Sequence, residues 1–196
     1  KTIGESFEYV CELKFDGLSI SLTYEDTRLV RAVTRGDGTK GDDVTTNVKT
    51  INNIPHKLKN EEVPPLFEIR GEIFMHRAAF ERLNKEREEL GEIQYANPRN
   101  FAAGTVKMQD SKEVARRPLD CFLYSLNTDK NYFKTHWESL QTLKSWGFNV
   151  STNSKLVSNI DEVLLFIKHW ETERFKLSYD IDGIVIKVNS YAQQQE

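Results

Sequence analysis

Residues 12–21 read ELKFDGLSIS, and this stretch decides how the fold begins. Its first half alternates charged with apolar residues, and its second half alternates apolar residues with Ser or Thr as far as residue 24. Both patterns are typical of half-buried strands. Gly17 between them allows a sharp bend or a close approach of two backbones. The stretch therefore predicts two consecutive strands that meet at a glycine.

Alternation in the first half gives Lys14 a specific setting. In an extended backbone Glu12, Lys14 and Asp16 lie on one face, while Leu13 and Phe15 point into the core. A lysine is a nucleophile only when it is neutral, and partial burial or a second cation nearby favours that form. The alternative is an ordinary charged strand edge that faces water. These residues alone do not decide between the two.

The rest of the chain predicts an α+β fold with largely antiparallel sheets flanked by helices, because strands and helices do not alternate regularly. Residues 28–35 would return as the hairpin partner of 18–24. Further strands are expected at 66–75, 119–126 and 181–188. Helices are expected at 45–51, 77–90, 135–146 and 160–174, with Gly91 and Gly147 as stop signals, and residues 94–107 form a loop followed by a helix of small residues.

Apolar spacing predicts which faces are buried. On strand 66–75 the apolar residues lie on one face and Glu68, Arg70 and Glu72 on the other. The core side of helix 77–90 would carry Phe80, Leu83 and Leu90, and that of helix 160–174 would carry Val163, Leu164, Ile167 and Trp170.

Composition indicates a soluble globular chain of one domain or two small lobes. It has 196 residues, is 38% hydrophobic and 29% charged, and carries a net charge of −3, which gives no overall attraction for nucleic acid. Neither a membrane span nor a signal peptide is recognisable. Cys11 and Cys121 are expected to be buried free thiols in a reducing compartment. Four scattered histidines show no metal-ligand spacing, so no metal site is predicted.

Gly36, Gly38 and Gly41 fit the G-x-G-x-x-G pattern of dinucleotide-binding loops, but the context argues against that function. The preceding strand is the second arm of a hairpin rather than the first strand of a β-α-β unit. The aspartates of GDGTKGDD, Asp37 included, would also place negative charge where a pyrophosphate must lie. A glycine loop with acidic turn residues is the better interpretation.

Three strands each present one charge from an otherwise apolar segment. They carry Lys14, Glu72 and Lys187, the last sharing a face with Val185. An unpaired charge is expensive on a buried strand. Three such strands favour an active site over three coincidental solvated faces.

These residues stand in motifs of a known family. KFDG resembles the K-x-D-G nucleophile motif of covalent nucleotidyltransferases, namely DNA ligases, RNA ligases and mRNA-capping enzymes. FEIRGEIF, LDCFLYSL and DGIVIK resemble their motifs III, IIIa and IV, in the same order. TRGDGTKGDDVTTNVKTINNIP and ANPRNFAAGTVK are similar to signatures of bacterial NAD-dependent DNA ligases. The resemblance covers essentially the whole chain and implies the adenylation domain.

It also implies a domain organisation and a cellular setting. Residues 1–196 would be the nucleotidyltransferase core, cut before motif V and lacking the N-terminal lobe that grips nicotinamide mononucleotide. The OB-fold, the zinc module and the C-terminal DNA-clamping modules of the family would also lie outside this chain. We expect a monomer from the bacterial cytoplasm, working at the nucleoid, whose present fragment binds adenine nucleotides weakly and does not seal nicks.

For catalysis the resemblance implies that Lys14 attacks the α-phosphate of NAD⁺ and forms an AMP–lysine phosphoramidate. AMP then passes to the 5′-phosphate of a DNA nick, and the nick is sealed. Asp16 would support the lysine and a later step, and Mg²⁺ would stabilise phosphoryl charge. Lys187 would touch the α-phosphate and favour neutral Lys14.

Nucleotide and phosphate contacts are implied in the same way. Glu12 would read the adenine amino edge, Tyr124 would stack on the adenine ring, and Glu72 would bind the ribose hydroxyls. Phosphates of the nucleotide or the nick would be contacted by Arg35, Arg99 and Arg174. Lys107 stands where the family is expected to carry an arginine that contacts DNA. A lysine keeps the positive charge but cannot make the two parallel hydrogen bonds of a guanidinium group. His76 and Arg77 are interpreted as structural.

Two alternatives remain. One is an ATP- or GTP-using relative, such as an RNA ligase or a capping enzyme. The other is a non-catalytic nucleotide- or DNA-binding module that has kept the fold, although the intact set of Lys14, Glu72 and Lys187 argues against it.

Overall fold

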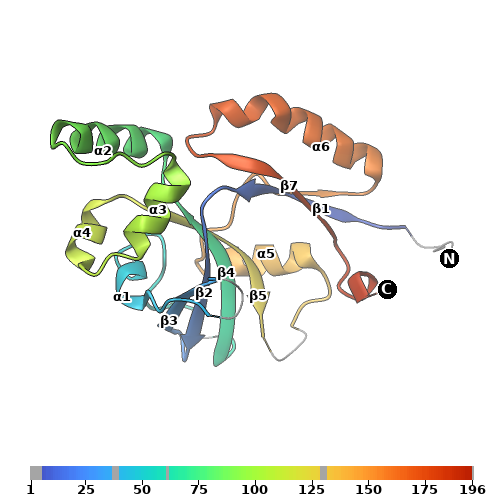
Figure 1. Cartoon of the computed structure of the whole chain (residues 1–196). Helices are drawn as coiled ribbons and strands as arrows, with labels where there is room; N and C mark the ends of the chain where they lie inside the picture. The colour runs from blue at the N-terminus through green and yellow to red at the C-terminus, as the bar shows by residue number, and fades with distance from the viewer. Residues whose placement is uncertain (1–5, 37–39, 61, 129–131, 196) are drawn as a thin grey trace.

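The computed structural model describes residues 6–36, 40–60, 62–128 and 132–195 and has the predicted α+β fold (Figure 1). Within these residues one antiparallel sheet has four strands in the order β3-β2-β4-β5, and a second has three in the order β6-β1-β7. The chain passes from the three-stranded sheet to the four-stranded one through Gly17, so the stretch 12–21 contains the end of the first strand of one and the start of the first strand of the other. An added Cβ at Gly17 would lie 2.1 Å from the carbonyl oxygen of Ile73, which is the predicted close backbone approach.

The four-stranded sheet is built on the predicted hairpin. Its strands are β2 (Leu18–Glu25), β3 (Arg28–Thr34), β4 (Leu66–Phe74) and β5 (Asp120–Asn127). Asp26 and Thr27 turn the chain between β2 and β3 with φ of 45° and 71°, the left-handed values of a type I′ hairpin. β3 is the second arm of this hairpin and not the first strand of a β-α-β unit. The G-x-G-x-x-G pattern therefore does not mark a dinucleotide-binding loop of the β-α-β type, as predicted. Asp37 and Gly38 of that motif lie outside the described residues.

The three-stranded sheet has the nucleophile candidate on its central strand. Its members are β1 (Tyr9–Phe15), β6 (Lys155–Val157) and β7 (Ile181–Val188). β1 is antiparallel to both neighbours, and its pairing with β7 is irregular between Leu13 and Phe15. Lys14 therefore lies where the regular ladder is interrupted. The short strand β6 was not predicted.

The sheets are flanked by helices, and side-chain caps mark where three of these helices begin. They are α1 (Thr45–Val48), α2 (Arg77–Glu89), α3 (Pro98–Val106), α4 (Ser111–Arg116), α5 (His136–Ser145) and α6 (Ile160–Glu173), and α4 was not predicted. Asn97, Thr135 and Asn159 cap α3, α5 and α6 by accepting a backbone N–H bond. Gly91 and Gly147 follow α2 and α5 with φ of 72° and 95°, as the stop signals predicted.

Two predictions about buried helix faces are wrong. Leu164 of α6 is 57% exposed, and Phe166 joins Val163 in the core instead. Leu90 is 74% exposed, whereas Phe80 and Leu83 pack against the large core. Leu164 lies roughly 100° around the helix from Val163 and outside the buried stripe. Leu90 continues the stripe as i+7 from Leu83, but it is the C-cap residue beyond the last turn of α2 and has left the core.

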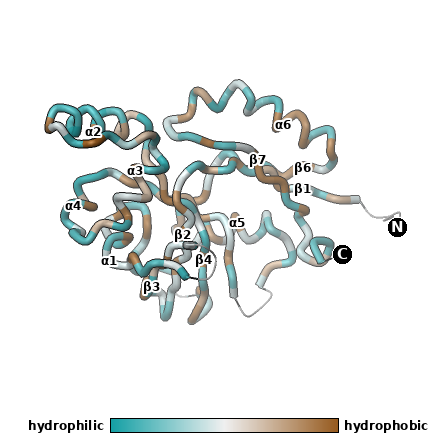
Figure 2. Tube along the Cα trace, in the orientation of Figure 1, coloured by the Kyte–Doolittle hydropathy of each residue, from teal (hydrophilic) through white to brown (hydrophobic). Residues whose placement is uncertain are grey.

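Two hydrophobic cores lie on either side of the sheet junction. Figure 2 shows hydrophobic residues concentrated along the strands, and α6 covers the small sheet (Figure 1). An aromatic cluster joins the two sheets, with ring centroids 4.5 Å apart for Phe15 and Phe122 and 5.1 Å apart for Phe74 and Phe122. Cys11 and Cys121 are buried free thiols, one in each core, as predicted. No helix in the described ranges is long and apolar enough to cross a membrane.

Candidate active site

Lys14 projects into a cleft between the two sheets. Its side chain is 58% exposed, and its Nζ lies 3.8 Å from Oδ2 of Asp182 on the neighbouring strand β7. Gly183 follows with φ of 152°, and a Cβ added there would lie 3.7 Å from Cδ of Lys14. This backbone conformation favours glycine, whereas the space beside Lys14 would admit a Cβ. Among the described residues the Lys14 amine has one ion pair, which is weak and exposed.

The cleft has two adjoining pockets. One, of about 600 Å³, is lined by residues of both sheets and of α3. The other, of about 290 Å³, is lined by β1 and β7 and by residues of the four-stranded sheet that include Glu72 and Tyr124. Both pockets are lined by Lys14, Arg35 and Glu72. A ligand that filled both pockets would therefore lie beside the side chain of Lys14.

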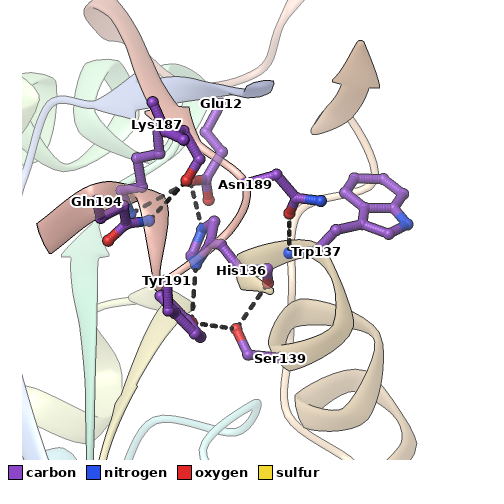
Figure 3. Close-up of polar contacts among 9 residues, drawn as sticks. Glu12, His136, Trp137, Ser139, Lys187, Asn189, Tyr191 and Gln194 are labelled. Atoms are coloured by element: carbon purple, nitrogen blue, oxygen red, sulfur yellow. Dashed lines mark hydrogen bonds and ion pairs between the residues drawn. The ribbon is translucent and has the colours of Figure 1, made fainter. Parts of the chain in front are cut away.

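Glu12, Lys187 and Tyr124 line the smaller pocket but not the larger one (Figure 3 shows the first two). Glu12 is 7% exposed, and its Oε2 lies 3.3 Å from Nζ of Lys187 and 2.8 Å from Nε2 of His136. Burial raises the pKa of Glu12, but the hydrogen bond from His136 and the charge of Lys187 outweigh it, so the pKa lies below its usual value. Glu12 is therefore an ionised acceptor at neutral pH.

The aromatic wall of this pocket is Tyr124 on β5. Nζ of Lys187 lies 5.6 Å from the centre of its ring, within cation–π distance. Burial, with a contribution from Glu72, raises the pKa of Tyr124 to about 12, so the phenol stays neutral. A neutral flat ring beside a buried carboxylate and a cation suits a planar heterocycle with polar edges.

Glu72 points from β4 into the middle of the cleft, as its strand face predicted. The hydroxyl of Ser19 donates to its Oε2 at 3.1 Å. Burial raises the pKa of Glu72 to about 7 despite this bond. The carboxyl group is therefore close to half protonated at neutral pH and can both donate to and accept from hydroxyl groups.

The open end of the cleft carries looser charges. Asp16 lies 3.7 Å from Nη1 of Arg99 on α3, and Lys107 lies 3.4 Å from Asp42. Burial and the neighbouring Asp182 raise the pKa of Asp16, while Arg99 opposes them. Arg99 and Lys107 line the larger pocket with side chains 59% and 49% exposed. Two cations that point into an open pocket suit phosphate groups.

Arg174, one of the residues predicted to contact phosphates, does not lie with Arg99 and Lys107 at the cleft. Arg174 follows α6, donates to the carbonyl of Ile181 at 2.5 Å and lies 5.8 Å from the Phe175 ring centre. It lines neither pocket of the cleft. Arg35 lines both, so the two arginines predicted together have different settings.

His76 and Arg77 have the structural role that was predicted. His76 bonds Asp120 and, at 2.8 Å, the hydroxyl of Ser178. Arg77 pairs with Asp180 at 2.9 Å and donates to the carbonyl of Leu177. Together they fasten the segment before β7 to the start of α2.

The sequence patterns missed three residues of the site: Ser19, Asp182 and His136. Ser19 alternates outward on β2, and Asp182 precedes the glycine of DGIVIK, so both were within reach of the strand pattern. His136 carries no such signal, because its partner Glu12 lies 124 positions earlier in the chain.

Comparisons with known proteins agree on one family. The model of the family described as NAD-dependent DNA ligase adenylation domain matches residues 1–196. Among curated relatives, proteins named DNA ligase from Cytophaga hutchinsonii, Christiangramia forsetii and Bacteroides fragilis are 55%, 52% and 52% identical to the chain. Each match covers 100% of the chain and 29% of the relative, so the chain spans less than a third of the length of these relatives.

Proposed function

The chain belongs to the adenylation domains of NAD-dependent DNA ligases, and we propose that Lys14 in it takes AMP from NAD⁺. The observation that carries this proposal is the position of Lys14 in the lining of two adjoining pockets, one with Glu12, Tyr124 and Lys187 and the other with the cations Arg99 and Lys107. Nζ attacks the α-phosphorus and loses a proton, an N–P bond forms, the P–O bond breaks, and nicotinamide mononucleotide leaves. NAD⁺ is a substrate here and no hydride moves.

The adenosine half of NAD⁺ occupies the smaller pocket in this proposal. The adenine ring stacks on Tyr124, and its amino group donates to the ionised Glu12. Glu72 binds the ribose hydroxyls, for which a carboxyl group with a pKa of about 7 is suited. Lys187 lies near both Glu12 and Tyr124, and its positive charge stabilises the negative charge of the α-phosphate, toward which it reaches. Arg35, which lines both pockets, binds the phosphates.

A magnesium ion in the cleft would neutralise phosphoryl charge. The described residues contain no group of three or more His, Cys, Asp or Glu side chains able to hold a metal ion by themselves. This fits magnesium, which keeps several waters and binds through one or two carboxylates together with substrate phosphates. Asp16, which lines the larger pocket, is the carboxylate that would hold it.

The later steps belong to the whole protein. AMP passes to the 5′-phosphate of a DNA nick, and the 3′-hydroxyl displaces it. Asp16 supports these transfers, and Arg99 and Lys107 hold phosphates at the open end of the cleft. Arg174 reaches a phosphate only if it leaves the Ile181 carbonyl. We propose that the full-length protein works on nicked DNA as a monomer in the bacterial cytoplasm, with a zinc module and DNA-clamping modules outside this chain.

The test is covalent labelling of the full-length protein. Incubation with NAD⁺ radiolabelled in the adenylate phosphate should transfer label to the protein, whereas ATP labelled at the α-phosphate should not. Peptide mass spectrometry should place the adduct on Lys14. Lys14→Ala should lower adduct formation by about a thousandfold or more.

The matched control is Lys155→Ala, which removes an exposed lysine from β6, beside β1, and should label as the wild type does. A full-strength adduct in Lys14→Ala would overturn the assignment of the nucleophile. Labelling from ATP or GTP would instead identify an enzyme of the RNA ligase or capping class. No adduct from any of the three nucleotides would indicate a non-catalytic binding module.

A further inference from the structure

The two oxygens of the buried Glu12 carboxylate have different environments. Oε2 makes both polar contacts of the carboxylate, with His136 at 2.8 Å and with Lys187 at 3.3 Å. Oε1 makes no hydrogen bond with any residue in the described ranges. Every fully buried side-chain nitrogen or oxygen in those ranges has a partner. Oε1 therefore reaches accessible surface, and the space beside Glu12 is the 290 Å³ pocket.

His136 is held in place on its far side as well (Figure 3). It is the first residue of α5, and its backbone N–H donates to the carbonyl of Asn189 on the segment after β7 at 2.8 Å. Its Nδ1 lies 3.4 Å from the hydroxyl of Tyr191, which donates to Ser139 at 3.1 Å. The ring is only 4% exposed. These contacts leave the ring one orientation, with Nε2 toward Glu12.

The proton on Nε2 follows from the partner. Glu12 is ionised, and a carboxylate only accepts hydrogen bonds, so the nitrogen 2.8 Å from it carries the hydrogen and donates. A charge-assisted bond of this length inside the protein is directional and restricts rotation of the carboxylate. Lys187 alone would not impose this, because its amine is a point charge on a flexible chain.

We propose that His136 is a positioning residue for base recognition: it holds one oxygen of Glu12 so that the other faces the pocket as an acceptor for an exocyclic amino group. This rests on the proposed function, in which the pocket receives the adenine of NAD⁺. Without the histidine the carboxylate can turn both oxygens toward Lys187, and the acceptor leaves the pocket. His136 thus acts on the specificity for the base, and it touches neither the base nor the reacting phosphate.

The experiment compares two dinucleotides in the self-adenylation of the full-length protein. One is NAD⁺, and the other is nicotinamide hypoxanthine dinucleotide, in which a carbonyl oxygen replaces the amino group. The wild type should prefer NAD⁺, because the carbonyl would face the Glu12 oxygen with no hydrogen between them. His136→Leu should reduce the ratio of the two kcat/KM values by about 10- to 100-fold, mainly through KM for NAD⁺. A wild type without preference would overturn the inference.

Two polar variants separate positioning from folding. His136→Gln places an amide N–H near the Nε2 position and should keep the wild-type ratio to within about threefold, whereas His136→Asn reaches only the Nδ1 position and should lose it. Equal ratios in these two variants would overturn the inference, even if His136→Leu does not fold. His76→Leu is the matched control, because His76 likewise bonds a carboxylate and a hydroxyl, but its carboxylate is that of Asp120, which does not line the pocket, and its ratio should stay unchanged.

Failure of the inference and failure of the proposed function give different results. If the wild type forms no adduct from NAD⁺, the proposed function fails. If adducts form and folded His136→Leu keeps the wild-type ratio, the function stands, and His136 is only a structural residue of α5.

Discussion

Two positions on strand β1 are held by opposite means: Glu12, at what we call the buried end of the site, and Lys14, at what we call its exposed end. Glu12 is 7% exposed with contacts of 2.8 and 3.3 Å, whereas Lys14, two residues later, is 58% exposed and 3.8 Å from its single partner in an ion pair, Asp182. The buried end has its geometry fixed before any ligand arrives, so it can select. The exposed end keeps a free side chain, which suits a nucleophile that must reach a phosphate and then carry it.

The largest expected effect on stability tests this difference directly. Glu12→Gln removes the charge between His136 and Lys187 and should lower the free energy of unfolding of the chain by about 2–3 kcal/mol, because a partly buried cation loses its partner. Asp182→Asn removes the partner of Lys14 and should cost about 0.5 kcal/mol or less, as exposed pairs do. Chemical denaturation at neutral pH measures both.

Equal losses in the two variants would show that the two ends are equally rigid, and the comparison would fail. Measuring the same two losses of stability at high salt makes the comparison between Glu12 and Lys14 more discriminating. Added salt should remove the small effect of Asp182→Asn and leave most of the effect of Glu12→Gln, because screening reaches exposed pairs first.

The next effect comes from Glu72, which lies between the two ends. Its pKa is about 7 in the folded chain against a usual 4.5. Between these values the folded state holds a proton that the unfolded state has lost, so the free energy of unfolding falls as pH rises from about 4.5 to 7. Allowing for partial exposure, the loss attributable to Glu72 should be about 2 kcal/mol. Glu72→Gln should remove this part of the pH dependence.

Denaturation of the chain at several pH values from about 4.5 to 7, the window of this titration, provides the measurement. Glu68→Gln changes a carboxylate on the same strand that lines neither pocket, and it should leave the slope as in the wild type. Asp16, whose pKa is also raised, contributes in the same direction and remains in both variants. An unchanged slope in Glu72→Gln would place the buried proton elsewhere.

The fold was predictable where the periodicity is local. The hairpin of β2 and β3, the strand β4 with Glu72 outward, and the stops at Gly91 and Gly147 each depend on neighbouring residues only. β6 has three residues and α4 has six, too short for a period to appear. Leu164 was misplaced because a stripe of apolar residues in α6 is wider than its buried part.

The residues of the candidate site can also be separated into those that local sequence patterns predict and those that they do not. Lys14, Glu72 and Lys187 were predicted because each is presented by a strand with an apolar face, and in the structure all three line one pocket. His136 could not be found, because its position depends on Asn189 and Glu12, which are distant in sequence and meet only through strand pairing. Supporting partners of a site are set by tertiary packing, which leaves no periodic trace in the chain.

The smallest expected effect concerns Lys107 at the open end, where charge should matter more than geometry. Its amine is half exposed and 3.4 Å from Asp42, so no fixed fork is formed. Lys107→Ala should leave stability within about 0.5 kcal/mol but reduce the salt dependence of DNA binding by the full-length protein by about one ion. Lys107→Arg keeps the charge and should change affinity by about twofold at most. A large gain with arginine would mean that a precise phosphate contact is made there, and that this end of the cleft is as ordered as the end around Glu12.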